Sequence, residues 1–223
     1  SNQLRIHKSS ASRLVQTLQK HHFLKNNNGL IEPGYGILQL AHMIQDKMDL
    51  RHIAKEYIEK LGEETKETIH LAILDDFEIV YVDKKDSPYP VRMHSSIGKR
   101  SPVYCTGVGK AILAYLEDKQ LKQVLKKITF HKYTKNTICS KEALLEDLKK
   151  IRAQGVAMDN SEHEEEVCCI AAPIFNFEKQ VIASISITTT TSRRSLKELL
   201  GYKDILLDTA QSISQEMGYL KES

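Results

Sequence analysis

The sequence lacks the features that assign a chain to a membrane, to the secretory route or to a disordered region. No apolar run among its 223 residues approaches the roughly 18 that a membrane-spanning helix needs. The chain does not open with basic, then apolar, then small residues, so we expect no secretory signal. Hydrophobic residues make up 41% and charged residues 27%, which is typical of a globular protein with a core.

Cysteine is scarce, and its spacing argues against disulfide staples and common metal sites. The four cysteines are Cys105, Cys139, Cys168 and Cys169, and no two of them form a Cys-x-x-Cys pair. On a strand, the neighbours Cys168 and Cys169 would point to opposite faces, so they are poor ligands for one metal ion. We predict reduced thiols in a cytoplasmic protein, with no cofactor and no metal.

Net charge is also low, at +3, but it is distributed unevenly. The first 25 residues hold five basic side chains and no acidic one, so this segment carries +5 and the other 198 residues carry −2. The basic residues are Arg5, Lys8, Arg13, Lys20 and Lys25. A short basic end on a near-neutral body indicates contact with a polyanion such as DNA, although a solvated helix face would give the same charge.

Residues 9–23 predict a helix that is suited to reading DNA. Apolar Ala11, Leu14, Val15 and Leu18 recur at helical spacing and would pack on the rest of the domain. The opposite face is short and polar, as a helix in the major groove requires. The residues that we predict to contact DNA are Lys8, Ser9, Ser10, Ser12, Arg13 and Thr17. An asparagine-rich turn ending at Gly29 then predicts a hairpin that can act as a wing.

The rest of the chain predicts an α+β protein. Helices are expected at 35–47, 49–61, 110–116, 119–126 and 140–153, and a further helical region runs from Ser195 to Met217. Strands are expected at 68–74, 78–83, 91–94, 156–159, 169–174 and 181–188. Because the strands come in hairpins and the helices in pairs, we expect an antiparallel sheet and not a doubly wound parallel one.

Two segments carry polar groups that suit a small ligand. Gly107 and Gly109 flank Val108 at a predicted helix start, where free backbone N–H groups suit a carboxylate, although a plain glycine-rich turn would look the same. Ser186 and Thr188 place two hydroxyls on one face of an apolar strand, where they either bond each other or bind a ligand. The segment is not a P-loop, because Tyr104 stands where that loop needs glycine.

Taken together, five segments resemble the IclR family of bacterial transcription regulators, and the resemblance covers essentially the whole chain in order. They are IHKSSASRL at 6–14, RSPVYCTGVGKAIL at 100–113, DNSEH at 159–163, CIAAPIF at 169–175 and IASISI at 182–187. The resemblance implies a partial winged helix-turn-helix domain at 1–34, a linker helix at 35–49 and a GAF-like effector domain at 50–223. Roughly the first 25–30 residues of the family are missing, so we expect an N-terminally incomplete chain.

The resemblance also implies partners and a ligand site. Members bind palindromic operator DNA as homodimers or dimers of dimers, more often as repressors, and respond to a small carboxylate. The positions that carry over to the effector site are Gly107, Val108, Asp159, Cys169, Ser186 and Thr188, with Val103 and Cys105 as second-rank wall residues. Cys168, Tyr104 and Thr189-Thr190 depart from the family pattern around this site, which leaves the effector's identity open.

Two other functions fit some of the same residues. Cys169 or Cys105 could serve as the nucleophile of a hydrolase, with His163 as base and Asp159 as orienter. His163, Cys168 and Cys169 could hold a metal, but their spacing matches no common site. The sequence offers no nucleophile elbow and no nucleotide fingerprint, so we predict a regulator and not an enzyme.

Overall fold

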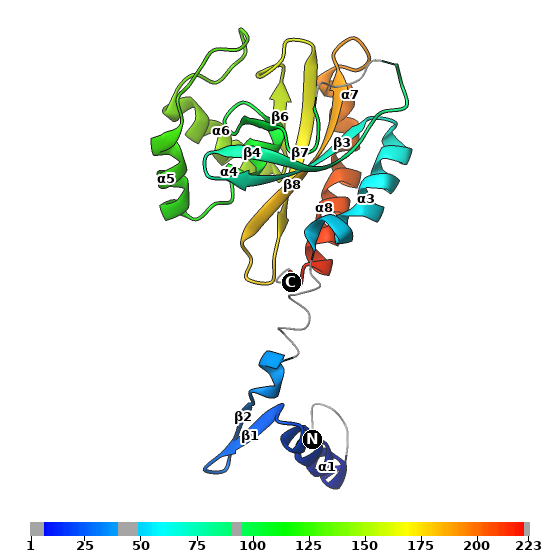
Figure 1. The fold of residues 1–223 in the computed structure, drawn as a ribbon, viewed down its shortest axis with the longest axis vertical. Helices are drawn as coiled ribbons and strands as arrows, with labels where there is room; N and C mark the ends of the chain where they lie inside the picture. Colours follow the sequence, from blue (N-terminus) through cyan, green and yellow to red (C-terminus); the bar gives the residue numbers. More distant parts are fainter. Residues whose placement is uncertain (1–6, 40–48, 91–94, 221–223) are drawn as a thin grey trace. The chain divides into compact units, whose positions relative to one another are not determined.

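The computed structural model describes residues 7–39, 49–90 and 95–220, and the chain divides into two compact units, 1–49 and 50–223. Within the described residues no helix is both long and apolar enough to cross a membrane. Figure 1 shows the elements of each unit. We describe the two units separately.

The first unit contains one helix and one hairpin. Helix α1 (Lys8–Lys20) is followed by strands β1 (Leu24–Asn27) and β2 (Leu30–Pro33), which pair antiparallel. Asn28 and Gly29 form the two-residue turn, both with positive φ (50° and 89°), which matches the twist of a tight hairpin. Residues 36–39 are helical, and the rest of the linker helix predicted at 35–47 lies outside the described residues.

Helix α1 begins one residue before the predicted start at residue 9, and it buries less apolar surface than expected. His7 is the N-cap, and its ring accepts from the Ser9 amide. Leu14 is 55% and Leu18 40% exposed, so the predicted packing of this stripe is wrong for the part of the unit that the structure describes. The hairpin strands have only four residues each and leave this side of α1 uncovered.

The second unit is built on a six-stranded sheet in which all five pairings are antiparallel, as predicted. Its strand order is β5-β4-β3-β8-β7-β6. The strands are β3 (Thr68–Asp75), β4 (Glu78–Lys85), β5 (Arg100–Pro102), β6 (Ala157–Asn160), β7 (Val167–Phe175) and β8 (Val181–Thr190). The sequence did not predict β5, because three residues ending in proline carry no alternation. The strand predicted at 91–94 lies outside the described residues.

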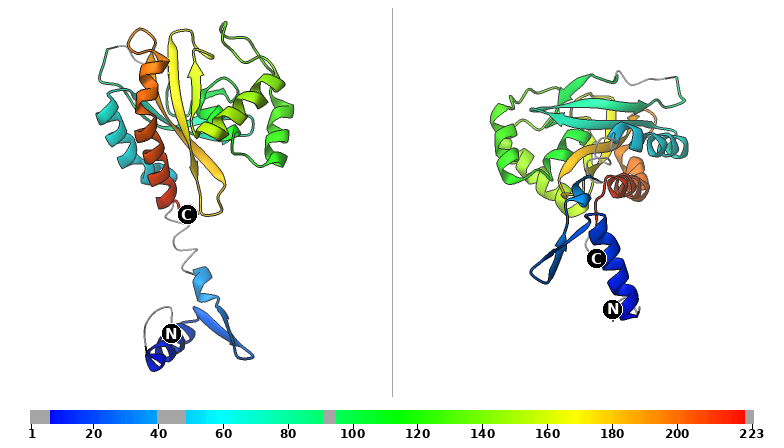
Figure 2. Two further views of the ribbon diagram at one scale, coloured as in Figure 1. Left: turned by 180° about the vertical axis from the view of Figure 1, so that it is seen from behind. Right: turned by 60° about the horizontal axis from the view of Figure 1, so that its bottom comes forward.

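Helices cover both faces of this sheet. Helices α3 (Leu50–Thr65) and α8 (Lys203–Glu216) pack side by side on one face, and α4 (Gly107–Leu113) packs on the other. Helices α5 (Asp118–Lys127) and α6 (Lys141–Gln154) lie on the α4 side, as Figures 1 and 2 show. A short helix, α7 (Leu196–Leu199), and a single 3-10 turn (Leu200–Tyr202) lead into α8.

The helix ends follow the local chemistry of the sequence. Ser140 caps α6, whose last turn closes on Gly155 in the left-handed conformation (φ 76°). Ser195 and Glu198 form a capping box at the start of α7, where the sequence predicted a helical region to begin. Thr106 caps α4 by accepting from the Gly109 amide at 3.3 Å. These caps fix where each helix begins, and for α4 that point is also where the candidate site lies.

Candidate binding cavity

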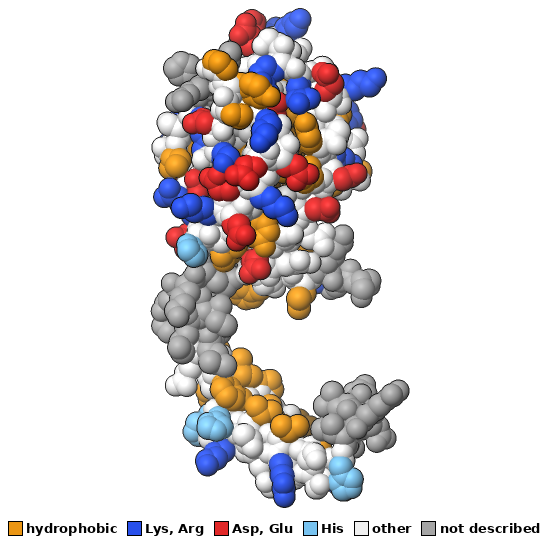
Figure 3. Space-filling model, turned by 90° about the vertical axis from the view of Figure 1, so that its right-hand side faces the viewer, with side chains coloured by type: hydrophobic (Ala, Val, Ile, Leu, Met, Phe, Trp, Pro, Cys, Tyr) orange, Lys and Arg blue, Asp and Glu red, His pale blue; other side chains and the backbone are white. Residues whose placement is uncertain are grey.

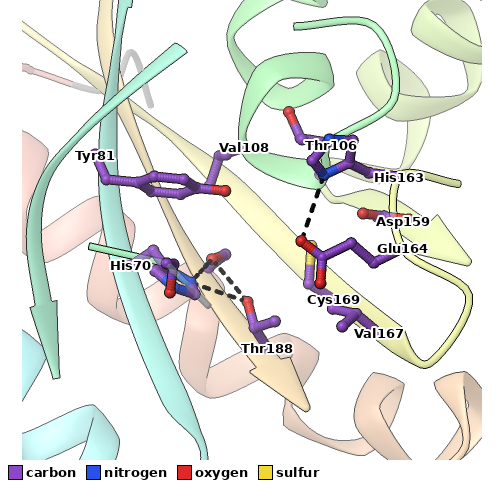
Figure 4. Close-up of a pocket in the computed structure, with 13 residues that line it drawn as sticks. His70, Tyr81, Thr106, Val108, Asp159, His163, Glu164, Val167, Cys169 and Thr188 are labelled. Carbon is purple, nitrogen blue, oxygen red and sulfur yellow. Dashed lines mark hydrogen bonds and ion pairs between the residues drawn. The ribbon is translucent and has the colours of Figure 1, made fainter. Parts of the chain in front are cut away.

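A cavity opens between the start of α4 and the sheet of the second unit. It offers about 50 Å³ of room for the centres of water-sized molecules, several times the roughly 10–15 Å³ that one water needs. Strands β3, β4, β7 and β8 form its floor, and the connection between β6 and β7 forms one wall, as Figure 4 shows. The cavity therefore has the dimensions of a site for a small molecule and not for a large cofactor.

All six residues that the sequence predicted for the effector site line this one cavity. They are Gly107, Val108, Asp159, Cys169, Ser186 and Thr188. Three of them form a row across the sheet, because Asp159 pairs with Cys169 and Cys169 pairs with Thr188 in the strand register. Four segments far apart in sequence thus converge. That they bind an effector remains a proposal.

Gly107 makes the closest approach between helix and sheet at this site. A Cβ atom on residue 107 would lie 2.5 Å from the Cys169 sulfur, which no real contact between such atoms allows. Glycine therefore lets the first turn of α4 come down onto β7. The N–H groups of a helix's first turn have no partner within the helix, so those of Gly107 and Val108 start at the edge of the cavity.

A polar cluster centred on His70, which the sequence analysis did not predict, lies on the opposite side of the cavity. The His70 Nδ1 atom lies 3.1 Å from Thr188 Oγ1 and 3.5 Å from Ser186 Oγ, and its Nε2 atom lies 2.7 Å from Ser95 Oγ. The ring of Tyr81 packs against the imidazole, with 4.9 Å between the two ring centroids. A histidine alternating with apolar residues on 68–74 was the available signal, since Ser186 and Thr188 were found by the same reasoning.

The other missed lining residues come from the segment that joins β6 to β7 and from its surroundings. They are Thr106, His163, Glu164 and Val167. His163 and Glu164 belong to this connecting segment, and Glu164 stays exposed to solvent while it lines the cavity. Figure 4 shows these two side chains meeting at the rim.

A buried ion pair fixes this segment to α4. Lys110 is 1% exposed, and its Nζ atom lies 2.6 Å from Glu162 Oε1 and 2.9 Å from Asp147 Oδ2. Burial alone would lower the pKa of Lys110, but the two carboxylates outweigh it and raise that pKa. Thr134 and Thr137 donate to the carbonyl oxygens of Ser161 and Glu162 at 2.6 Å each. The wall that carries His163 and Glu164 is therefore firmly held.

Burial controls the protonation of the cavity. It raises the pKa of Asp159 to about 7, although the Glu162 amide, which donates to Asp159 Oδ1 at 2.7 Å, works in the opposite direction. Burial, helped by the charge of Lys84, lowers the pKa of His70 to about 3, so this imidazole is neutral at pH 7. The cavity thus combines a carboxyl group that is close to half-protonated at neutral pH with an uncharged histidine.

The structure argues against both thiols as nucleophiles. Burial first, and then nearby Asp159, raises the pKa of Cys169 far above its ordinary value, and burial likewise raises the pKa of Cys105. A nucleophilic cysteine needs a thiolate, so neither environment activates sulfur. Cys168 lies on the other face of the sheet, with its sulfur 3.7 Å from the Arg194 carbonyl oxygen, as strand alternation predicted.

Val103 and Cys105 do not line the cavity, which corrects their assignment as wall residues. Both are fully buried in the core cluster that packs beneath α4. The reason is the turn at Thr106, which directs the chain into the helix, so only residues from Thr106 onward face the cavity. Among the described residues, no group of three or more His, Cys, Asp or Glu side chains is arranged to hold a metal ion.

The residues of α1 that we predicted to contact DNA are all exposed, and whether they do so stays a prediction. They are Lys8, Ser9, Ser10, Ser12, Arg13 and Thr17. Thr17 donates its hydroxyl to the Arg13 carbonyl oxygen at 2.9 Å, so it offers mainly its methyl group and a lone pair outward. On the face of the second unit in Figure 3, basic and acidic side chains are interspersed, so that face shows no basic patch to compete with α1.

With the fold and the cavity described, comparison with known proteins identifies the class of protein to which the chain belongs. Residues 42–215 match the family described as bacterial transcriptional regulator IclR C-terminal, which covers more than half of the chain. The chain belongs to the IclR family of bacterial transcription regulators. It is a regulator and not an enzyme, in agreement with the prediction from sequence.

Individual relatives support this membership over nearly the whole chain. The chain is 35% identical to the HTH-type transcriptional regulator XynR of Escherichia coli over 96% of its length and 86% of that protein. It is 37% identical to the regulator KdgR of the same organism, with 98% and 84% covered. The crystal structure of Thermotoga maritima IclR superimposes with a TM-score of 0.74 at 30% identity, with 98% of this chain and 89% of that chain covered.

Proposed function

We propose that this chain is a ligand-responsive regulator that binds operator DNA through α1 and the β1–β2 hairpin, and whose DNA affinity is set by a small carboxylate bound in the cavity beneath α4. The observation that carries the ligand half is the convergence of six residues from four distant segments on one cavity. The family membership supports the DNA half, because relatives over nearly the full chain are named HTH-type regulators.

The lining suits a small anion held by neutral donors. Gly107 and Val108 at the start of α4, Ser186 and Thr188 on β8, and the neutral His70 on β3 all line the same space. A carboxyl group with a pKa of about 7 at Asp159 can share the cavity with an anion, because it is neutral in a large fraction of molecules and can then donate a hydrogen bond. These features favour a carboxylate with few atoms.

A thermal-shift screen of small carboxylates tests the ligand half. A compound that binds only the folded state raises the melting temperature, by an amount that grows with its concentration. We expect at least one carboxylate to stabilise the wild-type chain and to lose its effect in Thr188→Val, which keeps the shape of the side chain but removes the hydroxyl. Equal shifts in the two proteins would place the binding site elsewhere.

Gel-shift titrations with the intact protein and DNA from upstream of its own gene test the DNA half. We expect specific binding at low salt that weakens as salt rises, since phosphate contacts dominate such interfaces. The carboxylate found in the screen should change the apparent affinity roughly 5- to 150-fold, the range of ordinary allosteric coupling. No specific shift at low salt would contradict the proposal.

We further propose a homodimer or dimer of dimers on a palindromic site, acting as a repressor. A two-fold operator matches a two-fold protein, because each reading helix then meets an equivalent half-site. Repression is supported by the named function of one relative, the HTH-type transcriptional repressor AllR of Salmonella typhi, which is 28% identical over 98% of this chain. Light scattering gives the oligomeric state, and a reporter gene behind the bound DNA gives the direction of regulation.

A further inference from the structure

The donor and acceptor roles around His70 decide which chemistry the cavity can hold. The described part of the cavity lining holds the carboxyl groups of Asp159 and Glu164 but no lysine or arginine, so a bound anion has to be held by neutral N–H and O–H groups. Two of these, the hydroxyls of Ser186 and Thr188, lie 3.2 Å apart and both approach the same nitrogen of His70. Which of His70, Ser186 and Thr188 donates and which accepts must therefore be worked out for the three groups together.

A count of protons shows that the imidazole tautomer sets this direction. If Nδ1 is bare, it accepts one hydroxyl proton, the second hydroxyl donates to the first, and both protons are consumed inside the cluster. If Nδ1 carries the proton, it donates to Thr188, and at most one hydroxyl proton is used between Ser186 and Thr188. The second arrangement leaves at least one O–H free to point into the cavity.

The geometry on the far side of the ring favours the second arrangement. The Nε2 atom lies 2.7 Å from Ser95 Oγ, which is at the short limit of the range for an N–H donor and close to the commonest distance for a hydroxyl donor. The Nδ1 atom lies 3.1 Å from Thr188 Oγ1, within the usual range for an N–H donor. A neutral imidazole has one donor and one acceptor, so both distances fit Nε2 accepting from Ser95 and Nδ1 donating to Thr188.

From this geometry we infer that His70 is a positioning residue that keeps at least one hydroxyl of the Ser186–Thr188 pair free to donate a hydrogen bond toward the cavity, and so selects anionic over neutral ligands. The inference rests on the proposed effector site and adds the residue that sets the direction of the hydrogen bonds in that site. Ser95 acts one step further out by holding the His70 ring in the Nδ1-protonated tautomer.

The tautomer itself is the first test, and it needs no ligand. Long-range proton–nitrogen spectra of the ¹⁵N-labelled full chain at pH 7 show which ring nitrogen carries the proton, and the His70 signals are assigned by their loss in His70→Gln. We expect the proton on Nδ1. A proton on Nε2 would overturn the inference whatever the chain binds.

Binding measurements form the second test, with lactate and its neutral isostere lactamide as probes. In His70→Asn the side-chain amide can still donate from near the Nδ1 position, whereas in His70→Gln it reaches the Nε2 position and leaves Thr188 without its donor. We expect His70→Asn to keep the wild-type preference for lactate within about threefold, and His70→Gln to lose roughly tenfold of it. His52→Gln, an exposed histidine on α3, is the control.

The outcomes separate the two proposals. An unchanged preference in His70→Gln, with melting confirming a folded protein, would overturn the role of His70. If the wild-type chain binds lactamide as well as lactate, the inferred selectivity is wrong. If no carboxylate in the wider thermal-shift screen binds the wild-type chain, the proposed effector class fails, while the tautomer measurement still decides how the hydroxyls are oriented.

Discussion

At the scale of single residues, the cavity depends on a few side chains whose properties arise from burial. Asp159 and His70 are ordinary titratable groups whose pKa values burial moves in opposite directions, upward for the acid and downward for the base. Gly107 acts through the absence of a side chain, since any Cβ atom would collide with Cys169. Each of these properties gives a measurable consequence.

Asp159→Asn should flatten part of the pH dependence of stability. The pKa of Asp159 is about 7 in the folded protein and near 3.8 in the unfolded chain, so the folded state binds more protons in this window and stability falls as pH rises from about 4 to 7. Asparagine can still accept from the Glu162 amide and does not titrate. As the pH rises from 4 to 8, the free energy of unfolding of the variant should increase relative to that of the wild type by on the order of 2–4 kcal/mol.

Urea unfolding of both proteins at several pH values measures this difference. His70 contributes in the opposite direction, because its pKa is about 3 in the folded protein and near 6.5 in the unfolded chain, so stability rises with pH between these values. That contribution is shared by the two proteins and cancels in their difference. A constant difference across pH would show that Asp159 titrates normally.

Gly107→Ala should both destabilise the second unit and abolish any response to a cavity ligand. The new methyl group would lie 2.5 Å from the Cys169 sulfur, and overpacking of this kind costs about 1–3 kcal/mol. The double variant Gly107→Ala with Cys169→Ala relieves the collision, so the two changes should be strongly non-additive. Denaturant midpoints of the four proteins measure this coupling, and additive effects would contradict the proximity of helix and strand.

At the scale of elements, α4 is the point where the sheet, the core and the loop over the cavity meet. Its first turn borders the cavity, Lys110 reaches the segment between β6 and β7, and the Val108 carbonyl oxygen accepts from Ser184 on β8 at 2.8 Å. A ligand that shifts α4 would therefore move the wall and the sheet contact together. This arrangement makes α4 the natural element to respond to occupancy.

Lys110→Met should lower the free energy of unfolding by about 3–5 kcal/mol, because it leaves Glu162 and Asp147 without their buried counter-charge. Lys149→Met is the matched control, since Lys149 pairs with Glu146 at 3.7 Å on an exposed surface where such pairs contribute little. Denaturant midpoints compare the two. If Lys110→Met does not fold, the milder Asp147→Asn should still destabilise more than Lys149→Met, and equal midpoints would argue against a structural ion pair.

Helix α1 gives the element-scale prediction for DNA. Arg13→Ala should weaken operator binding, because an exposed arginine on the reading helix would contact phosphate or a base edge. The slope of log affinity against log salt concentration should become shallower by about one. Lys122→Ala on α5 removes the same charge from the second unit and should leave affinity unchanged. Unchanged affinity in Arg13→Ala would remove this face of α1 from the interface.

At the scale of the whole molecule, the chain consists of two units with different cores. In the second unit, two layers of helices enclose a sheet with many fully buried side chains, whereas α1 in the first unit has no buried residue. A domain with its own core can fold alone. The C-terminal domain of Escherichia coli KdgR, which matches 77% of this chain with a TM-score of 0.70 at 42% identity, has been crystallised as such.

Residues 50–223 produced alone should therefore keep the stability and the ligand response of the intact chain while losing DNA binding. Circular dichroism melting, the thermal-shift screen and gel shifts measure the three properties. Retained specific DNA binding by this fragment would contradict the assignment of DNA reading to the first unit. A melting temperature far below that of the intact chain would show that the second unit needs the first.

The sequence by itself determined the class of fold, the starts of α6 and α7 and the family, because periodicity, capping chemistry and motif order are local properties of the chain. It also pointed to the cavity residues Gly107, Val108, Ser186 and Thr188, since hydroxyls and glycines stand out in apolar segments, and the family resemblance added Asp159 and Cys169. It failed where the signal depended on neighbours: β5 is too short to show alternation, Leu14 and Leu18 are exposed, and Val103 and Cys105 lie in the core.

Only the tertiary structure decided which groups in the cavity bond one another and which of them carry a proton. Strand pairing brings His70 of β3 beside Ser186 and Thr188 of β8, more than one hundred residues away in sequence. Packing buries Lys110 against two carboxylates and removes Asp159 from water, which sets the charge of the site. The dielectric environment and the hydrogen-bond partners of a residue come from distant segments, so the sequence supplies the groups and the fold decides their protonation and direction.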